Sequence, residues 1–379
     1  MLTGAMAAVP AMTMDMYLPS MPIIARELMT TQSMVQGTVS AILIGGAVGQ
    51  LVNGPISDRF GRRLPFFIGM SLHVAMSIAI MFAGNLYWLL GLRLLQGIGN
   101  ASATVAAMAV LRDRFSGPAV AAGISRNMMV VSVAPIIAPS IGGFIATHWG
   151  WRGVFAVLGA IGLALMVGAW AFLPETHPAH RRTTTLRIFS SYTPLLRDFG
   201  FMRLALVPSF TMVVLMAYVS SASFIYQETF GLSAAQFALV FALNGLGMIV
   251  FAQLNSRLVY RLGSHRILWR ALATEIALAA ALLVLALAGA VTWWVFALAT
   301  FLLLAVNTMT MPNGAALALA DQGKRAGTAT ALMGAMQAGM GGALAPLVGV
   351  LGGDTTALAI VALAALLVAA ALLATARRA

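Results

Sequence analysis

Residues 355–376, TTALAIVALAALLVAAALLATA, contain no charged side chain. A helix needs about 20 apolar residues to cross the hydrocarbon core of a bilayer. This stretch is long enough and apolar enough to do so. It predicts a transmembrane helix, and the rest of the chain repeats the same pattern.

Eleven similar stretches precede it, so the sequence predicts twelve transmembrane helices. They are residues 2–19, 35–55, 64–84, 87–110, 119–146, 152–173, 204–226, 234–256, 266–288, 291–316 and 326–350. One long, charged connection divides them into two sets of six. We expect an all-α membrane protein with an N-terminal six-helix bundle at 1–173, a cytoplasmic linker at 174–203 and a C-terminal six-helix bundle at 204–379.

The composition excludes several classes of protein. Of 379 residues, 61% are hydrophobic and 8% are charged, whereas a soluble domain has about 25% charged residues. That excludes a cytosolic enzyme and a secreted binding module. The net charge of +12 comes from 22 Lys and Arg residues that are too dispersed for a nucleic-acid-binding face. The chain has no cysteine, Gly-rich phosphate loop or HExxH motif, so we expect no cofactor, no metal and no enzyme activity.

The basic residues predict the orientation of the chain. With the N-terminus inside, the outer loops hold only Arg26 and Arg152. The inner loops and the C-terminal tail hold Arg59, Arg62, Arg63, Arg112, Arg114, Arg181, Arg182, Arg187, Arg197, Arg203, Arg257, Arg261, Arg266, Arg270, Lys324, Arg325, Arg377 and Arg378. Cytoplasmic loops carry an excess of Lys and Arg, so both termini are expected in the cytoplasm.

The two halves contain an internal repeat. The sequence RFG at 59–61, after the second span, resembles RLG at 261–263, after the eighth, and APSIG at 138–142 resembles APLVG at 345–349. Parallel repeats of this kind build many carriers, with the substrate site between the halves. Asp58 aligns with Tyr260, so we expect the first half to carry more of the polar chemistry.

Two opposite charges are predicted inside the first half. Asp15 lies about 6 Å inside the outer end of the first span, and Arg93 lies about 7–8 Å inside the outer end of the fourth. A charge inside a membrane is costly and usually functional. We expect Asp15 to bind and release a proton and Arg93 to tune it, meeting directly or through water; a static ion pair is the alternative. His73 and Glu275 are weaker candidates, for which ordinary packing is favoured.

The sequence GPISDRFGRR at 54–63 is the most specific short signal. Gly54 is expected to let helices approach closely and Gly61 to form a tight turn. Asp58 is expected to pair with Arg112, or to bind at the N-terminus of the eleventh helix near Gly327. Such a contact is a conformational lock on the inner face; the alternative is that the arginines only fix the topology. The candidate lock residues are Gly54, Asp58, Arg59, Gly61, Arg62, Arg63 and Arg112.

The fifth span contains two prolines four residues apart, Pro135 and Pro139, followed by Gly142 and Gly143. The prolines are expected to kink the helix and the glycines to allow close packing. This combination suits two halves that rock against each other.

Five segments resemble a known transporter family. GPISDRFGRR at 54–63 resembles the signature loop of the major facilitator superfamily, and RLLQGIGNA at 93–101 resembles its fourth-helix motif. APIIAPSIGG at 134–143 resembles the antiporter motif of drug exporters. DMYLPSMP at 15–22 is similar to the first-helix signature of the drug:proton antiporters for bicyclomycin, chloramphenicol and florfenicol, the Bcr/CflA-type subfamily. PNGA at 312–315 also resembles these exporters.

The resemblance implies proton-driven export of small drugs across the bacterial inner membrane by alternating access. It also implies that helices one, four, seven and ten line the cavity while three, six, nine and twelve face lipid, which makes His73 and Glu275 less plausible as site residues. Candidate cavity residues are Tyr17, Gln96, Tyr218, Phe224 and Asn313. The expected partners are a small drug molecule, protons and the lipid bilayer, with the protein acting as a monomer.

Two alternatives stay open at this point. A proton-linked symporter or exporter of a small metabolite, such as a sugar or an amino acid, would use the same scaffold, because direction is set by coupling and not by fold. A membrane scaffold or receptor that transports nothing is the second, and the charged residues inside the spans argue against it.

Overall fold

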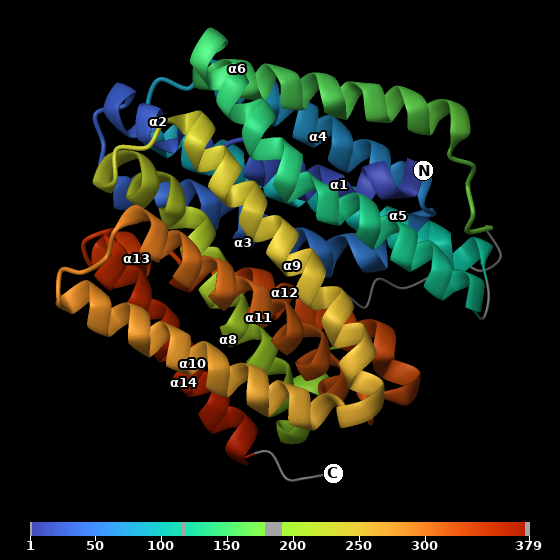
Figure 1. Ribbon diagram of the computed structural model, residues 1–379. Coiled ribbons are helices and arrows are strands. Elements are labelled where there is room, and N and C mark those ends of the chain that lie inside the picture. Colours follow the sequence, from blue (N-terminus) through green and yellow to red (C-terminus); the bar gives the residue numbers. More distant parts are fainter. Residues whose placement is uncertain (1, 116–117, 179–191, 376–379) are drawn as a thin grey trace. The chain divides into compact units, whose positions relative to one another are not determined.

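The computed structural model describes residues 2–115, 118–178 and 192–375, and they form helices joined by short connections (Figure 1). No β-strand occurs in these ranges, so the all-α class is confirmed. The chain divides into two compact units, residues 1–30 with 41–188 and residues 31–40 with 189–379. Residues 179–191, most of the predicted linker's basic part, lie outside the described ranges, as do Arg377 and Arg378. The three-part division predicted above stays a prediction.

The first unit is built around helices that pack pairwise over their apolar faces. Its elements are α1 (Leu2–Asp15), the short turn η1 (Leu18–Ser20), α2 (Met21–Glu27), most of α3 (Gln32–Phe60), α4 (Arg63–Met81), α5 (Leu86–Arg114) and α6 (Pro118–Phe172). Helix α1 packs against α5 and α6, and α4 packs against the same two helices. Small residues such as Ala103 and Ala107 of α5 face Met6 and Phe66 in a buried core, which lets these helices come close.

The second unit follows the same plan. Its elements are α7 (Thr193–Leu196), α8 (Phe199–Phe224), the π-turn η3 (Ile225–Thr229), α9 (Ala234–Leu262), α10 (Ser264–Leu287), α11 (Trp293–Leu319), η4 (Gly323–Arg325), α12 (Ala326–Leu344), α13 (Leu347–Val350) and α14 (Thr355–Thr375). Helix α8 packs against α11, α12 and α14, and α10 packs against α11 and α14. Asp198 caps α8 by accepting a hydrogen bond from the Phe201 amide at 3.0 Å.

Ten helices in the described part of the chain are long and apolar enough to cross a membrane, against twelve predicted. The first difference is α1, which has 14 residues because the α-helix ends at Asp15 and the chain continues through η1 into α2. The second is α6, which runs for 55 residues and breaks at Gly150, where φ is +71°. It therefore contains both predicted spans, 119–146 and 152–173.

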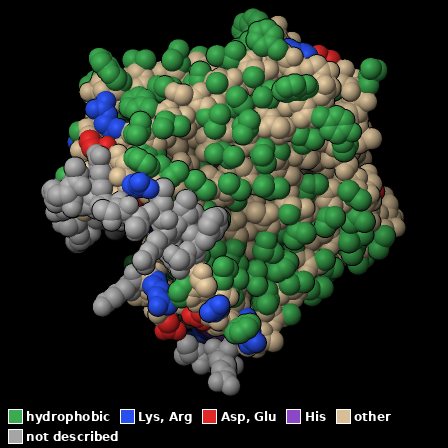
Figure 2. All heavy atoms as spheres, turned by 180° about the vertical axis from the view of Figure 1, so that it is seen from behind, with side chains coloured by type: hydrophobic (Ala, Val, Ile, Leu, Met, Phe, Trp, Pro, Cys, Tyr) green, Lys and Arg blue, Asp and Glu red, His purple; other side chains and the backbone are tan. Residues whose placement is uncertain are grey.

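The exterior is apolar. Figure 2 shows hydrophobic side chains spread over the visible face, with the charged side chains near its edges. Large exposed apolar side chains include Leu163 and Val167 of α6 and Val284 and Leu287 of α10. Exposed apolar surface on this scale is costly in water and suits contact with lipid.

The internal repeat is visible in the backbone. Helices α3 and α9 each have 29 residues and each ends one residue before a glycine, Gly61 or Gly263. These glycines have φ of +92° and +76°, values that favour glycine because it has no Cβ. The next helix starts within two residues in both cases. The sequence repeat therefore marks a structural repeat at these positions.

Gly142 allows α6 to lie directly against the end of α1. A Cβ atom added at Gly142 would be 2.0 Å from the Met16 carbonyl oxygen. Because that oxygen belongs to the backbone, no side-chain rotation could relieve the contact. Gly142 thus fixes the distance between α6 and the segment that carries Asp15.

We expect Gly142→Ala to destabilise the protein by about 1–3 kcal/mol, because α1 and α6 must move apart. Gly91→Ala in α5 is the matched control, since a Cβ there would meet nothing within 4 Å. Thermal unfolding in detergent measures both variants. Equal unfolding temperatures for the two would contradict the close approach.

Glu27 of α2 binds α6 at one end of unit 1, next to the connection between α4 and α5. It accepts hydrogen bonds from the Arg152 guanidinium and from the Trp151 indole nitrogen, the latter at 2.7 Å. Arg152 also donates to the Ala83 carbonyl at 3.2 Å. The hydrogen bond from Arg152 lowers the pKa of Glu27 from its ordinary 4.5, the bond from Trp151 also lowers it, and partial burial opposes both. The carboxylate is therefore the form that holds α2 to α6 just after Gly150 and, through Arg152, to the connection before α5.

Protonation of Glu27 should weaken this contact. Because its pKa is lower in the folded protein, the stabilisation is fully present above pH 4.5 and is lost as the pH falls through the lowered value. We expect the thermal midpoint of Glu27→Gln to fall less on acidification than that of the unaltered protein. Glu228→Gln, at an exposed position, serves as the control and should keep the full acid dependence.

Candidate functional site

A chain of buried polar side chains joins α1, α4 and α5 inside unit 1. Arg93 is 0% exposed and donates from Nη1 to the Gln96 side-chain oxygen at 2.9 Å and to the Thr13 carbonyl of α1 at 3.3 Å. Gln96 donates from Nε2 to the Ser77 hydroxyl at 2.8 Å, and Ser77 donates to the His73 carbonyl at 2.8 Å. This network places the Arg93 charge in the interior of an apolar bundle.

Aromatic rings cover the same charge. The guanidinium carbon of Arg93 lies 4.5 Å from the ring centre of Tyr17 and 5.6 Å from that of Phe155. A desolvated cation on an aromatic face gains about 2 kcal/mol. Nε and Nη2 of Arg93 have no hydrogen-bond partner among the described residues. The side chain thus keeps donors available in a place that water does not reach freely.

Asp15 is buried near this network but does not pair with Arg93. It is 7% exposed, and no ion pair within 4.0 Å joins it to Arg93 among the described residues. Arg93 contacts the backbone carbonyl of Thr13 and the ring of Tyr17, which lie two residues on either side of Asp15. The structure therefore shows no direct ion pair between Asp15 and Arg93, and a contact through water stays a prediction.

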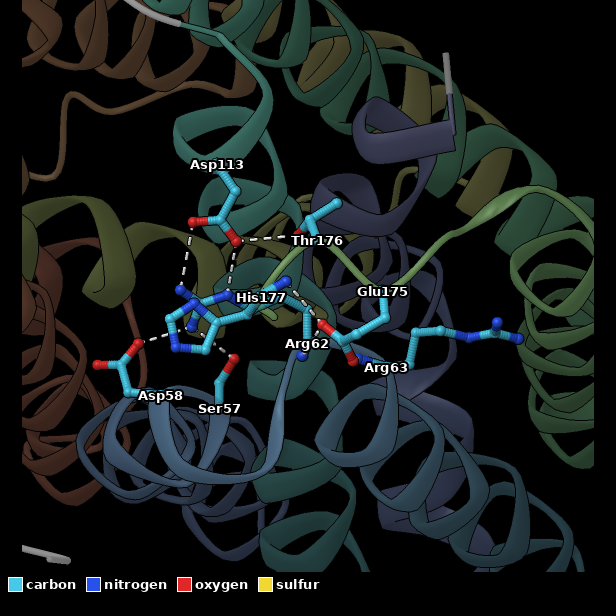
Figure 3. Close-up of polar contacts among 8 residues, drawn as sticks. All are labelled: Ser57, Asp58, Arg62, Arg63, Asp113, Glu175, Thr176 and His177. Carbon is cyan, nitrogen blue, oxygen red and sulfur yellow. Dashed lines mark hydrogen bonds and ion pairs between the residues drawn. The ribbon is translucent and has the colours of Figure 1, made fainter. Parts of the chain in front are cut away.

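A second charged site lies where α3, α4, α5 and the segment after α6 meet (Figure 3). We call it the Arg62 cluster, and it consists of Ser57, Asp58, Arg62, Asp113, Glu175 and Thr176. Figure 3 shows the Arg62 side chain between the two aspartates.

Arg62 is the centre of this cluster. Its side chain is 9% exposed and contacts both aspartates, Nη1 with Asp58 at 2.6 Å and Nε with Asp113 at 2.8 Å. Nη2 adds a second bond to Asp113 at 3.3 Å, and Nη1 also donates to the Ser57 hydroxyl at 3.1 Å. Burial by itself would lower the pKa of Arg62, but the bonds to Asp113 and Asp58 outweigh it and the pKa is raised. Arg62 therefore stays charged and ties α3 to α5.

Glu175 holds the first turn of α4. It accepts hydrogen bonds from the backbone amides of Arg62 at 2.9 Å and Arg63 at 3.2 Å. A helix N-terminus has unsatisfied amides and a partial positive charge, so a carboxylate there satisfies both. Thr176 donates to Asp113 at 2.9 Å. The segment after α6 is thereby attached to the same cluster.

The expected partner of Asp58, Arg112, is wrong for this structure. Asp58 pairs with Arg62, four residues later, while Arg112 is exposed. Neighbouring residues on a helix point about 100° apart, so when Asp113 faces Arg62, Arg112 is turned away. Sequence reasoning searched for a cation for Asp58 and missed Asp113 and Glu175. The sequence does contain a signal for Asp113, because this acid lies between two arginines, Arg112 and Arg114.

The other residues of the predicted lock have varied surroundings. Gly61 forms the turn before α4, as predicted, with φ of +92°. Arg63 donates to the Trp170 carbonyl at 3.3 Å, and Arg59 lies 5.2 Å from the ring centre of Phe60. Gly54 has no described atom within 4 Å of an added Cβ, so the close approach expected there stays a prediction.

The predicted antiporter motif lies in α6. The backbone remains helical at Pro135 and Pro139, and the non-helical backbone recorded in α6 is at Gly150. Gly142 makes the close approach to α1 described above, and Gly143 is buried beside it. A kink at the two prolines stays a prediction.

The candidate cavity residues are all buried and interact within their own units. Tyr17 and Gln96 belong to the Arg93 network in unit 1. In unit 2, Tyr218 accepts a hydrogen bond from Asn244, and Asn313 donates to Asn255 at 2.7 Å. Phe224 is 1% exposed. Their contact with a substrate stays a prediction.

The fold and these motifs agree with one family. The sequence model of the family described as Major Facilitator Superfamily matches residues 3–346 of this chain. The chain belongs to the Major Facilitator Superfamily. It is therefore a multi-pass membrane transporter and not an enzyme, and the resemblance found in its motifs is confirmed at the level of the family.

Similar proteins refine the assignment. The chain is 34% identical to the uncharacterized MFS-type transporter YdgK of Bacillus subtilis, over 94% of this chain and 89% of that protein. It is 31% identical to the bicyclomycin resistance protein homolog of Haemophilus influenzae, over 93% and 89%. It is 32% identical to a chloramphenicol resistance protein of Pseudomonas aeruginosa, over 67% and 60%. These similarities place the chain with the Bcr/CflA-type members of the superfamily.

Solved structures share the fold. The nucleoside transporter NupG aligns with a TM-score of 0.75 at 11% identity, over 98% of this chain and 96% of that one. The xylose transporter XylE of E. coli aligns with a TM-score of 0.74 at 15% identity, over 97% and 95%. Identities this low support the architecture alone.

The Arg62 cluster predicts a contrast between two arginines. Arg62→Ala should destabilise the protein by about 2 kcal/mol, because charge-assisted hydrogen bonds to Asp113 and Asp58 are lost. Arg112→Ala, an identical change in an exposed residue, should cost less than about 0.5 kcal/mol. Thermal unfolding in detergent compares them. Equal losses, or a larger loss for Arg112→Ala, would contradict the pairing that we describe.

Proposed function

We propose that this transporter exports small drugs of the chloramphenicol, florfenicol and bicyclomycin type in exchange for protons. The observation that carries the proposal is the buried carboxyl of Asp15, at the end of α1, without an ion-pair partner among the described residues. Burial without a counter-ion favours the neutral, proton-carrying form of a carboxyl group. The names of two relatives, a bicyclomycin resistance protein homolog and a chloramphenicol resistance protein, support drugs as the substrate class.

Asp15 and Arg93 have separate roles in this proposal. Asp15 takes a proton from the outer side and releases it on the inner side. Arg93, whose Nε and Nη2 atoms have no partner among the described residues, stabilises the carboxylate when a movement of α1 brings the two together. One proton moving through 100 mV gains about 2.3 kcal/mol, enough for roughly a fifty-fold drug gradient.

The Arg62 cluster fixes the inner end of unit 1, where we propose the conformational lock. It joins α3, α4, α5 and the segment after α6 at one end of unit 1, so unit 1 can move as a rigid body. Tyr17, Gln96, Tyr218, Phe224 and Asn313 are the proposed cavity wall. We place the monomeric protein in the bacterial inner membrane with both termini in the cytoplasm, as the distribution of basic residues indicates.

The coupling role of Asp15 is tested in everted membrane vesicles that report a pH gradient with a fluorescent dye. Adding chloramphenicol should dissipate the gradient with the unaltered protein. The Asp15→Asn protein should insert into the membrane normally but lose this response, because an amide does not bind and release a proton as a carboxyl group does. Asp321→Asn, an exposed acid in unit 2, is the control and should respond like the unaltered protein.

Two results would contradict the proposal. A full response from Asp15→Asn would remove Asp15 from coupling. A gradient that is insensitive to every drug, but is dissipated by a sugar or an amino acid preloaded in the vesicles, would support proton symport of a metabolite instead.

A further inference from the structure

A second buried acid lies in unit 2, on a helix where the family resemblance predicted contact with lipid. Glu275 of α10 is 0% exposed. Its carboxyl group contacts Asn307 of α11 inside the unit, which agrees with the ordinary packing favoured for it, although this helix was expected to face lipid. The drug-export proposal does not use this residue. A carboxyl group this deep in an apolar bundle needs a separate explanation.

The partner of Glu275 is Asn307 of α11. Asn307 donates from Nδ2 to Oε2 of Glu275 at 3.1 Å and to the Thr211 carbonyl of α8 at 3.2 Å. Both partners are acceptors, so the amide must present its nitrogen to them and its oxygen elsewhere. The two oxygens left over, Oε1 of Glu275 and Oδ1 of Asn307, are buried and have no hydrogen-bond partner among the described residues.

The Thr310 hydroxyl offers little to an ionised carboxylate. It interacts with Glu275, but it donates its one proton to the Asn307 carbonyl at 2.7 Å. Its single proton cannot serve both acceptors at once. Among the described side chains, Asn307 and Thr310 interact with Glu275.

In the described part of the chain, no cation forms an ion pair with Glu275. Helices α11 and α14, which pack against α10, contain no titratable side chain. No ion pair involves Glu275 among the described residues. The titratable residues of the remaining neighbours and of α10 itself are Arg203 and Tyr218 of α8, Arg257, Tyr260 and Arg261 of α9, and His265, Arg266 and Arg270 of α10. An unpaired buried carboxylate would cost several kcal/mol.

We propose that Glu275 is a proton-binding site, in which a proton on Oε1 is shared with Oδ1 of Asn307. A carboxylic acid and a carboxamide pair through two complementary hydrogen bonds, and one of them, from Nδ2 to Oε2, is already present. A proton on Oε1 of Glu275 makes that atom a donor to Oδ1 of Asn307, so both unsatisfied oxygens gain a hydrogen bond. The proton remains bound at neutral pH, and the neutral pair ties α10 to α11, while the Asn307 nitrogen ties both to α8.

This proton differs from the one assigned to Asp15. Glu275 lies in the other unit, is fully buried and bonds two helices that pack closely along their length. We infer that it positions helices and is not exchanged during transport. A neutral isostere should therefore replace it.

Infrared difference spectroscopy tests protonation directly. The purified protein carrying Asp15→Asn is compared with the same protein carrying Glu275→Gln as well, so Asp15 cannot contribute. At neutral pH the carbonyl stretch of a protonated carboxyl should be present in the first and absent in the second. Glu228→Gln, an exposed acid in the same unit, is the matched control and should leave that band unchanged. If the Glu275→Gln change instead removes bands of an ionised carboxylate, the proposal is wrong.

Stability and transport give independent measurements. Glu275→Gln keeps both hydrogen bonds, so it should retain the thermal midpoint at neutral pH and the drug-induced proton response, whereas Glu275→Leu should be less stable. A folded Glu275→Gln protein without proton-linked transport would overturn the positioning role. A thermal midpoint raised by sodium in place of choline, in the unaltered protein but not in Glu275→Gln, would show a metal cation at the site instead of a proton.

Discussion

In a bundle of apolar helices, each polar group that leaves water needs a partner inside the same bundle. Four described ionisable side chains respond to this constraint in three ways. Arg62, at one end of unit 1, has two carboxylates and a hydroxyl around it. Arg93, in the interior, has a carbonyl, an amide oxygen and two aromatic faces. Asp15 and Glu275 have no ion-pair partner among the described residues, and we propose that both carboxyl groups are neutral.

The two arginines show how the same charge can be stabilised differently at different depths. Near water, a carboxylate loses little of its hydration when it pairs with an arginine. The Arg62 cluster therefore fixes the ends of several helices with charge-assisted hydrogen bonds. Inside the bundle, a carboxylate would need its own desolvation. Arg93 instead uses backbone, amide and aromatic groups, which are polar or polarisable but uncharged. Its Nε and Nη2 atoms have no partner among the described residues, and we propose that they bind the Asp15 carboxylate when the helices move.

The two units share a backbone repeat but differ in their charged residues. Gly61 and Gly263 end equivalent helices with the same backbone conformation, so the repeat preserves the turn. It does not preserve the charge, since Tyr260 occupies the position of Asp58 and is 91% exposed. Unit 2 has its buried acid in α10, whereas Asp15 of unit 1 lies at the end of α1. The two units thus share a fold and have acquired different polar networks.

The sequence by itself determined the helices, the membrane location, the family and the buried acid in the first span, because apolar length, glycine turns and short motifs are local properties of a chain. Only the tertiary structure decided the partners. It placed Arg62 with Asp113 instead of Arg112 with Asp58, turned Arg93 to Tyr17 instead of Asp15, and buried Glu275 against Asn307. Which face of a helix meets which neighbour depends on its rotation about its own axis. A difference of one or two residues changes that direction by 100° to 200°, and sequence spacing within one helix says nothing about the rotation of the next.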